Sequence, residues 1–200
     1  MRRDELARIR RREMLAAYYE TLLDEGLQGA SVAKIARRID APPSLLIHYF
    51  GTKEQMTIEL VDYLLERFHD SFVVSLEGIA DPLERLRAVV DSLFSVEYHQ
   101  LLDDRAFYAL FYLSLTHPTV RRAFARVYEE SLALVEETLR ECMDNGLIPE
   151  DDARELAVTL KALEEGYAFL IGGADEEAKA EIGSALRKRA LQLLGLPADV

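Results

Sequence analysis

Glycine and proline divide this chain into blocks whose apolar residues recur at helical spacing. In residues 4–25, Leu15, Tyr18 and Leu22 share one helical face, and Gly26 follows as a helix stop. Leu and Ala together number 56, against 28 for Val, Ile and Thr. Because straight-chain side chains lose little rotamer freedom in a helix, this excess favours helix over sheet. The pattern predicts an all-α fold of about nine helices without a strand.

The first blocks predict a helix-turn-helix head. Ser31 is a good N-cap residue for a second helix of about eight residues. Pro42 and Pro43 end that helix, and Pro43 suits the first turn of a third helix from Ser44 to about residue 49. The segment Thr52-Lys53-Glu54-Gln55 is a capping-box pattern that begins a fourth helix ending near residue 75. The later expected helices cover about residues 81–99, 104–116, 118–145, 150–171 and 176–194.

The charge of the chain is unevenly distributed. The net charge is −12, which by itself argues against binding a polyanion such as DNA. Residues 1–55, however, carry 10 Lys and Arg against 8 Asp and Glu, whereas residues 56–200 carry 14 against 28. This asymmetry indicates a basic head on an acidic body. The alternative for the arginines near the N-terminus is a solvated arm.

Several classes of protein are excluded by composition and spacing. Cys142 is the only cysteine, so an intrachain disulfide and a cysteine-based zinc site are excluded, and we expect a reducing, cytoplasmic location. The longest uncharged run has 15 residues, short of the roughly 18 apolar residues of a membrane span. Neither a glycine-rich phosphate loop, a nucleophile elbow nor a metal-ligand spacing of histidines occurs. We expect neither an enzyme nor a bound metal or cofactor, and no membrane partner.

Residues 29–56, GASVAKIARRIDAPPSLLIHYFGTKEQM, resemble the DNA-binding head of the TetR family of bacterial transcriptional regulators. The resemblance rests on Ile35-Ala36 in the second helix, His48-Tyr49-Phe50 at the end of the third, and Gly51-Thr52-Lys53-Glu54 at the entry to the fourth. It covers about residues 5–60. It implies a DNA-binding helix-turn-helix domain over residues 1–52 and a helical effector-binding and dimerisation domain over residues 53–200.

The resemblance also implies which residues contact double-stranded DNA. The exposed face of the third helix enters the major groove, and the residues around it clamp phosphates. Lys53 lies at the positive end of its helix, which favours an anion. For each basic residue, simple solvation is the alternative. The candidates are Ser31, Lys34, Arg37, Ser44, Leu45, Ile47, His48, Tyr49 and Lys53.

The chain departs from the family pattern in the turn and at the start of the third helix. Asp40 stands where the turn usually has glycine, which bears on the backbone of the turn. Pro42 replaces a capping Ser or Thr, whose side chain contributes on the order of 1 kcal/mol. Ala33 removes a long side chain from a position that often faces DNA. We therefore expect specificity to depend largely on methyl contacts and DNA shape.

Aromatic residues are concentrated in the body, where 11 of the 17 lie between Tyr63 and Tyr128. In TetR-like proteins such a region encloses a small effector, and the acidic body favours an apolar or amphipathic effector over an anionic one. The alternative is that these residues are simply core. The candidate pocket residues are Phe72, Phe94, Tyr98, Phe107, Phe111, Tyr128, Leu163 and Tyr167.

The last two expected helices carry apolar stripes that favour a four-helix homodimer interface. Gly166 would allow close approach of a partner helix, and packing within one chain is the alternative. The candidate interface residues are Leu156, Leu160, Gly166, Leu170, Ile182 and Leu186.

The preferred function is a homodimeric TetR-type repressor, released from a near-palindromic operator by a small effector. An activator or architectural role stays open. So does a small-molecule-binding or interaction protein whose DNA-binding head has degenerated.

Overall fold

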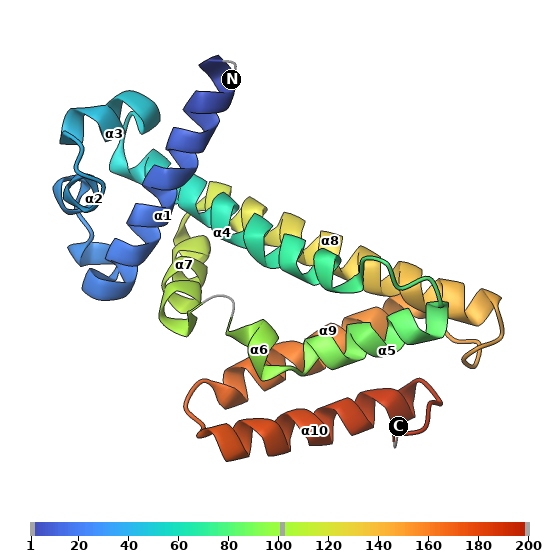
Figure 1. Cartoon of the computed structure of the whole chain (residues 1–200). Coiled ribbons are helices and arrows are strands. Elements are labelled where there is room, and N and C mark those ends of the chain that lie inside the picture. The colour runs from blue at the N-terminus through green and yellow to red at the C-terminus, as the bar shows by residue number, and fades with distance from the viewer. Residues whose placement is uncertain (1–2, 101–102, 199–200) are drawn as a thin grey trace. The chain divides into compact units, whose positions relative to one another are not determined.

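The computed structural model describes residues 3–100 and 103–198, and this part of the chain contains ten helices and no strand (Figure 1). The all-α prediction is confirmed. The helices are α1 (Arg3–Gly29), α2 (Val32–Arg38), α3 (Pro43–Phe50), α4 (Lys53–Leu76), α5 (Pro82–Leu93), α6 (Val96–His99), α7 (Asp104–Thr116), α8 (Pro118–Asp144), α9 (Ala153–Ile171) and α10 (Glu176–Leu193). No described helix is long and apolar enough to cross a membrane.

Aspartate side chains fix the starts of three helices. Asp81, Asp152 and Asp175 each accept a hydrogen bond from the backbone N–H three residues further on, at 2.8, 2.9 and 2.9 Å. Each bond satisfies one of the N–H groups that the first turn of a helix leaves without a partner. These caps set the first residues of α5, α9 and α10, and only α9 begins later than expected.

Two further helix boundaries differ from the expectation. The single helix expected over residues 81–99 is two helices, because α5 ends at Leu93 and Ser95 caps α6 by accepting a hydrogen bond from the Tyr98 N–H at 3.1 Å. A serine side chain that binds nearby backbone competes with helix continuation, which explains the break. At Gly26, φ is +69°, so the helix kinks there, and one more turn follows before Gly29.

The chain forms two compact units. The N-terminal unit comprises Met1–Arg67 and Leu102–Arg126, and thus contains the expected head together with the start of α4, α7 and the start of α8. Within it, α1 packs against α2 and α7, and α2 packs against α3 (Figure 1). Its buried side chains include Met14, Leu15, Tyr18, Ile35, Leu46, Phe50, Met56 and Leu60.

The C-terminal unit comprises Phe68–Leu101 and Val127–Val200. Within it, α10 packs against α5, α6 and α9 (Figure 1). Its core is mostly aliphatic and includes Leu86, Val89, Val90, Leu93, Val135, Leu139, Leu160 and Leu191. Cys142 is buried in this core, where its thiol contacts the backbone carbonyl of Pro82 at 3.2 Å and burial raises the thiol pKa.

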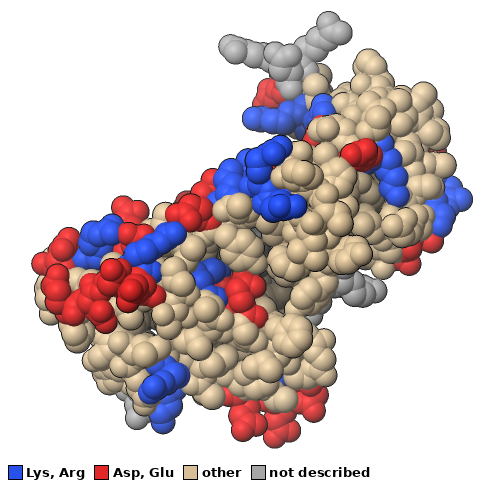
Figure 2. Space-filling model, turned by 180° about the vertical axis from the view of Figure 1, so that it is seen from behind, with Lys and Arg blue, Asp and Glu red and all other residues tan. Residues whose placement is uncertain are grey.

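The two units differ strongly in charge. The N-terminal unit carries 15 Lys and Arg against 13 Asp and Glu, a net charge of +2. The C-terminal unit carries 9 against 23, a net charge of −14. Figure 2 shows red acidic side chains gathered in several patches on the C-terminal unit. The charge asymmetry of the sequence is therefore also an asymmetry between folded units.

Candidate DNA-binding and effector sites

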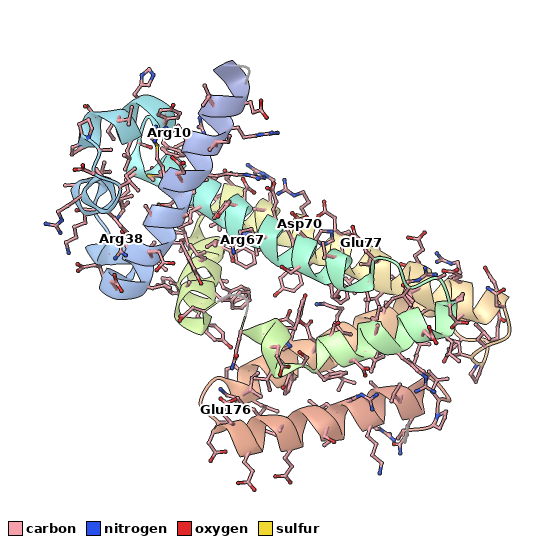
Figure 3. The ribbon with its side chains drawn as sticks, in the orientation of Figure 1. Arg10, Arg38, Arg67, Asp70, Glu77 and Glu176 are labelled. Atoms are coloured by element: carbon pink, nitrogen blue, oxygen red, sulfur yellow. The ribbon has the colours of Figure 1, made fainter. Side chains whose placement is uncertain are left out.

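The predicted phosphate-binding residues of α2 differ in how far they are engaged within the chain. Ser31 caps α2, accepting a hydrogen bond from the Lys34 N–H at 3.3 Å. The Lys34 ammonium pairs with Glu25 at 2.6 Å, and Arg38, labelled in Figure 3, pairs with Asp24 of α1. Arg37 is exposed and pairs with no acidic side chain in the described part of the chain. Of the predicted cations in this helix, Arg37 is the one most available to a phosphate.

The turn after α2 keeps its tight geometry with Asp40 in place of glycine. The Asp40 N–H bonds to the Arg37 carbonyl at 3.3 Å, and the Ala41 N–H bonds to the Ala36 carbonyl at 3.0 Å. This pair of bonds is a Schellman motif, which requires a left-handed residue at the position that Asp40 occupies. Asp40 has φ +49° and is the only described residue other than glycine with positive φ. The substitution changes the energy of the turn and not its hydrogen bonds.

Helix α3 presents a mixed polar and apolar surface. Leu46 and Phe50 are buried and fix the helix in the N-terminal unit, while Ser44, Ile47 and His48 are exposed and share one face. Ile47 keeps 44% of its surface exposed, so it offers aliphatic surface to the solvent side of the helix. The other two predicted contact residues of this helix, Leu45 and Tyr49, are half-buried. As expected from the sequence, Pro42 precedes this helix without a side-chain cap.

The start of α4 is tied to two other segments of the N-terminal unit. The Lys53 ammonium donates a hydrogen bond to the Leu27 carbonyl at 3.1 Å, so it is held at the end of α1. The next residue, Glu54, lies 3.3 Å from Nε2 of His117, between α7 and α8. The side chains of Lys53 and Glu54 both line a cavity of about 230 Å³. An ammonium has three donor hydrogens, so Lys53 retains donors for a phosphate.

Two side-chain contacts between α1 and α4 support α3. The Arg11 guanidinium binds both carboxylate oxygens of Glu59, at 2.5 and 2.7 Å, and lies 4.7 Å from the centre of the Phe50 ring. The hydrogen bonds to Glu59 raise the pKa of Arg11. Deeper in the unit, the Tyr18 hydroxyl lies 2.7 Å from that of Thr57, and burial raises the Tyr18 pKa. The first of these contacts reaches α3 through Phe50, and both join α1 to α4.

The predicted effector residues are divided between the two units. Phe72, Phe94, Tyr98, Tyr128, Leu163 and Tyr167 belong to the C-terminal unit, whereas Phe107 and Phe111 belong to the N-terminal unit. In the C-terminal unit, Phe72 contacts Tyr98 and Phe94 contacts Tyr167, with ring centres 5.6 and 6.0 Å apart. In the N-terminal unit, Phe107 and Phe111 stack on each other and both contact Phe124. That all eight line one cavity stays a prediction.

Charged side chains on α9 are buried beside these aromatic residues. Lys161 and Glu164 form an ion pair whose side chains are only 8% and 3% exposed. The Lys161 ammonium lies 6.0 Å from the centre of the Tyr128 ring, and Nε2 of His99 lies 4.0 Å from the Glu164 carboxylate. Burial raises the pKa of Glu164 despite the opposing effect of Lys161. We call these four residues and Glu165 the α9 charge cluster.

Glu165 extends this cluster toward the surface. Glu165 is exposed as a whole residue. Burial of its carboxyl group and the charge of Glu164 nevertheless raise its pKa. Lys161 and a hydrogen bond with Tyr128 oppose this shift. Close packing of α10 against α9 also affects Tyr167. The Tyr167 hydroxyl is buried and has no hydrogen-bond partner among the described residues, and α10 passes close to it at Gly183.

The predicted dimer residues divide into core and surface. Leu160 is fully buried in the C-terminal unit and is therefore not part of an exposed face, which corrects its assignment to the interface. Leu156, Ile182 and Leu186 are half-buried against the same core, whereas Gly166 and Leu170 are exposed. Two large apolar side chains of α9 were not among the predicted interface residues although they are exposed. They are Val158, 47% exposed, and Phe169, 74% exposed.

Two family models match the chain. The model of bacterial regulatory proteins of the tetR family matches residues 15–60, and the tetracyclin repressor-like C-terminal domain matches residues 81–196, more than half of the chain. The chain belongs to the TetR family. This TetR-family chain is a transcriptional regulator with a DNA-binding N-terminal domain and a ligand-binding C-terminal domain.

Curated relatives of this TetR-family regulator carry the name HTH-type transcriptional regulator BetI. The protein from Rhizobium meliloti is 29% identical over 82% of this chain and 75% of its own length. That from Agrobacterium fabrum is 29% identical over 96% and 84%. Both of these relatives are named as regulators of transcription.

Solved structures share the fold of this regulator. A TetR transcription regulator from Haloarcula marismortui has a TM-score of 0.78 at 21% identity, covering 92% of this chain and 96% of that one. A putative transcriptional regulator from Saccharomonospora viridis, solved in complex with choline, has a TM-score of 0.76 at 20% identity, covering 91% and 95%. At these identities the likeness shows the fold.

Proposed function

We propose that this TetR-family regulator is a homodimeric repressor that places α3 of each subunit in one half of a near-palindromic operator. The observation that carries the proposal is the exposed face of Ser44, Ile47 and His48 on a helix fixed by buried Leu46 and Phe50. A helix held rigidly with a solvent-facing side is what major-groove binding requires. As a DNA-binding protein that needs no membrane partner, it works in the cytoplasm, and we assign it no catalytic activity.

Each predicted contact residue has a role that fits its chemistry. Ser44 and His48 can hydrogen-bond to base edges, and Ile47 offers an aliphatic surface to thymine methyl groups, as does Leu45 where it is exposed. Arg37 contributes a phosphate contact, because its guanidinium is exposed and uncommitted. We assign further phosphate contacts to Ser31, Lys34, Tyr49 and Lys53.

The intact turn supports a working head over a degenerate one. Asp40 forms the left-handed residue of a complete Schellman motif, so the hydrogen bonds that close the turn between α2 and α3 are all present. Pro43 still supplies the first turn of α3.

We further propose a small amphipathic cation, of the quaternary ammonium class, as the effector. The α9 charge cluster joins carboxylates with aromatic rings, the combination that recognises an organic cation. The Saccharomonospora viridis protein of the same fold was solved in complex with choline, which makes choline the first compound to test. An anionic effector is disfavoured by the net charge of −14 on the C-terminal unit.

Release from DNA then follows from a shift of α4. This helix begins at Lys53 and Glu54, which are tied to α1 and to His117, and it continues into the C-terminal unit. An effector that favours one position of α4 changes the population of the DNA-binding arrangement.

The dimer uses the exposed apolar residues of α9, with Val158, Phe169 and Leu170 as its largest contributions.

The DNA-binding role is tested with duplexes selected from a random-sequence pool by the protein itself. Fluorescence anisotropy is measured for the wild type, for Ile47→Glu on α3, and for Val74→Glu, a matched exposed aliphatic position in the C-terminal unit. Losing an apolar base contact and adding a negative charge should weaken binding by about tenfold or more for Ile47→Glu. Val74→Glu should bind as the wild type does. Equal affinities for all three proteins would contradict the assignment of α3.

A further inference from the structure

The α9 charge cluster already contains a cation. Lys161 and Glu164 lie one turn apart on α9, and both side chains are almost fully buried. The ammonium pairs with a carboxylate and lies 6.0 Å from the centre of the Tyr128 ring, and an external organic cation would need the same two kinds of group. Apart from this ion pair, Oε2 of Glu164 is buried and makes no hydrogen bond within the described residues.

A buried carboxylate of this kind is expensive without a counter-ion. Removing a charge from water costs several kcal/mol even after relaxation, and only a close opposite charge with good geometry offsets that cost. Lys161 supplies this charge, and His99, at 4.0 Å from Glu164, supplies a second cation only when it is protonated. The cluster is therefore stable with one cation in place, whatever its source.

Lysine is suited to giving up such a position. Its ammonium is carried on a flexible four-carbon stem, which can lie along an apolar surface while the charge moves to water. Ala162, next to Lys161, and Glu165, one turn further along α9, are both exposed, so the buried ion pair lies beside solvent-facing positions of the helix. An ammonium on a rigid or shorter side chain would lack this freedom.

We propose that the Lys161 ammonium is an exchangeable internal cation that occupies the effector's cation site in the unliganded protein and is displaced by a small ammonium ligand. The inference rests on the proposed effector class. It assigns Lys161 the task of setting the ligand concentration at which the regulator responds. Glu164 serves both cations in turn, and Tyr128 contacts whichever is present.

The exchange makes a quantitative statement about affinity. The apparent Kd equals the intrinsic Kd divided by the fraction of protein whose site is open, so a site open about one tenth of the time weakens binding about tenfold. Replacing Lys161 with an uncharged side chain of similar length removes this competition. A positioning or purely structural lysine predicts the opposite, because its removal weakens the site.

The test is calorimetric titration of the full-length protein with tetramethylammonium chloride. Lys161→Met should bind about tenfold more tightly than the wild type, and Glu164→Gln should lose binding. Lys179→Met is the matched control, since Lys179 forms an i,i+3 ion pair with Glu176 (labelled in Figure 3) on α10 of the same unit. It should bind as the wild type does.

A charge-retaining variant keeps the inference falsifiable if Lys161→Met fails to fold. Lys161→Arg places a bidentate donor on Glu164, so the ligand should displace the arginine side chain less easily than the lysine. This variant should therefore bind the ligand more weakly than the wild type does. Wild-type binding that is lost in Glu164→Gln but unchanged or weakened in Lys161→Met, or unchanged in Lys161→Arg, would overturn the exchange alone. Absence of binding to the wild type and every folded variant would overturn the effector class and the exchange with it.

Discussion

Replacing Asp40 tests how much strain the turn of the DNA-binding head holds. Asp40 is the left-handed residue of the Schellman motif after α2, with φ +49°. Placing a Cβ in this conformation costs roughly 1–2 kcal/mol for an ordinary L-residue, less for Asp or Asn, and nothing for Gly. Glycine gives back roughly 0.5–1 kcal/mol as backbone entropy. We therefore expect Asp40→Gly to be more stable than Asp40→Ala by about 1 kcal/mol.

Thermal unfolding of the full chain measures the difference. For a protein of this size, about 1 kcal/mol corresponds to roughly 2–4 °C in Tm. The predicted order of Tm places Asp40→Ala below both the wild type and Asp40→Gly. Asp40→Asn controls for the lost charge and should match the wild type, because Asn tolerates the left-handed region. An Asp40→Ala protein as stable as Asp40→Gly would refute the reasoning.

Three further outcomes follow from the structure. Tyr18→Phe removes the buried hydrogen bond to Thr57 and should cost about 1 kcal/mol of unfolding free energy in a denaturant titration. Gly183→Ala should cost about 1–3 kcal/mol, since its Cβ would lie 2.7 Å from a backbone carbonyl oxygen, whereas a Cβ at Gly166 meets nothing within 4 Å in its own chain, so Gly166→Ala should cost less. Because burial raises the Glu164 pKa above its ordinary value, tetramethylammonium should bind more tightly as the pH rises through that raised pKa.

Each of these outcomes has a result that contradicts it. Tyr18→Phe without any loss of stability would mean that the hydroxyl contact contributes nothing to holding α1 on α4. Equal unfolding energies for the two glycine variants would refute the close approach of α10 at Gly183. The sign of the pH effect follows from a carboxyl group that is neutral at low pH and binds a cation only once ionised. Glu164→Gln should abolish binding, so a wild-type affinity that is independent of pH would contradict the role of Glu164.

The helices could largely be predicted because local chemistry marks their ends. Asp81 followed by proline, Ser31, and the Pro42-Pro43 pair each act on backbone within a few residues of themselves. The break before α6 was missed, because the apolar periodicity continues across Ser95. A single serine within such a pattern is weak evidence for the start of a new helix. The exposed face of α3 was expected from the resemblance to TetR-family heads, and Ser44, Ile47 and His48 are exposed there.

The long-range contacts could not be predicted from sequence spacing. Arg11 and Glu59 are 48 residues apart, and nothing in either segment marks the other as its partner. Lys161 and Glu164 have the i,i+3 spacing of an ordinary surface ion pair, so their burial emerges only when α9 is packed. Leu160 was assigned to a dimer stripe for the same reason, because a periodic stripe does not say whether its partner lies within the chain or outside it.

The salt dependence of DNA binding tests the central claim most directly, that only the basic N-terminal unit contacts the operator. The logarithm of the association constant is measured against the logarithm of salt concentration for the wild type, Arg37→Gln and Lys188→Gln, an exposed position on α10. Each phosphate contact contributes about 0.9 to the slope, so losing one per subunit should flatten it by about 1.8 in a dimer. Lys188→Gln should keep the wild-type slope. A wild-type slope near zero, or equal flattening by both substitutions, would contradict the account.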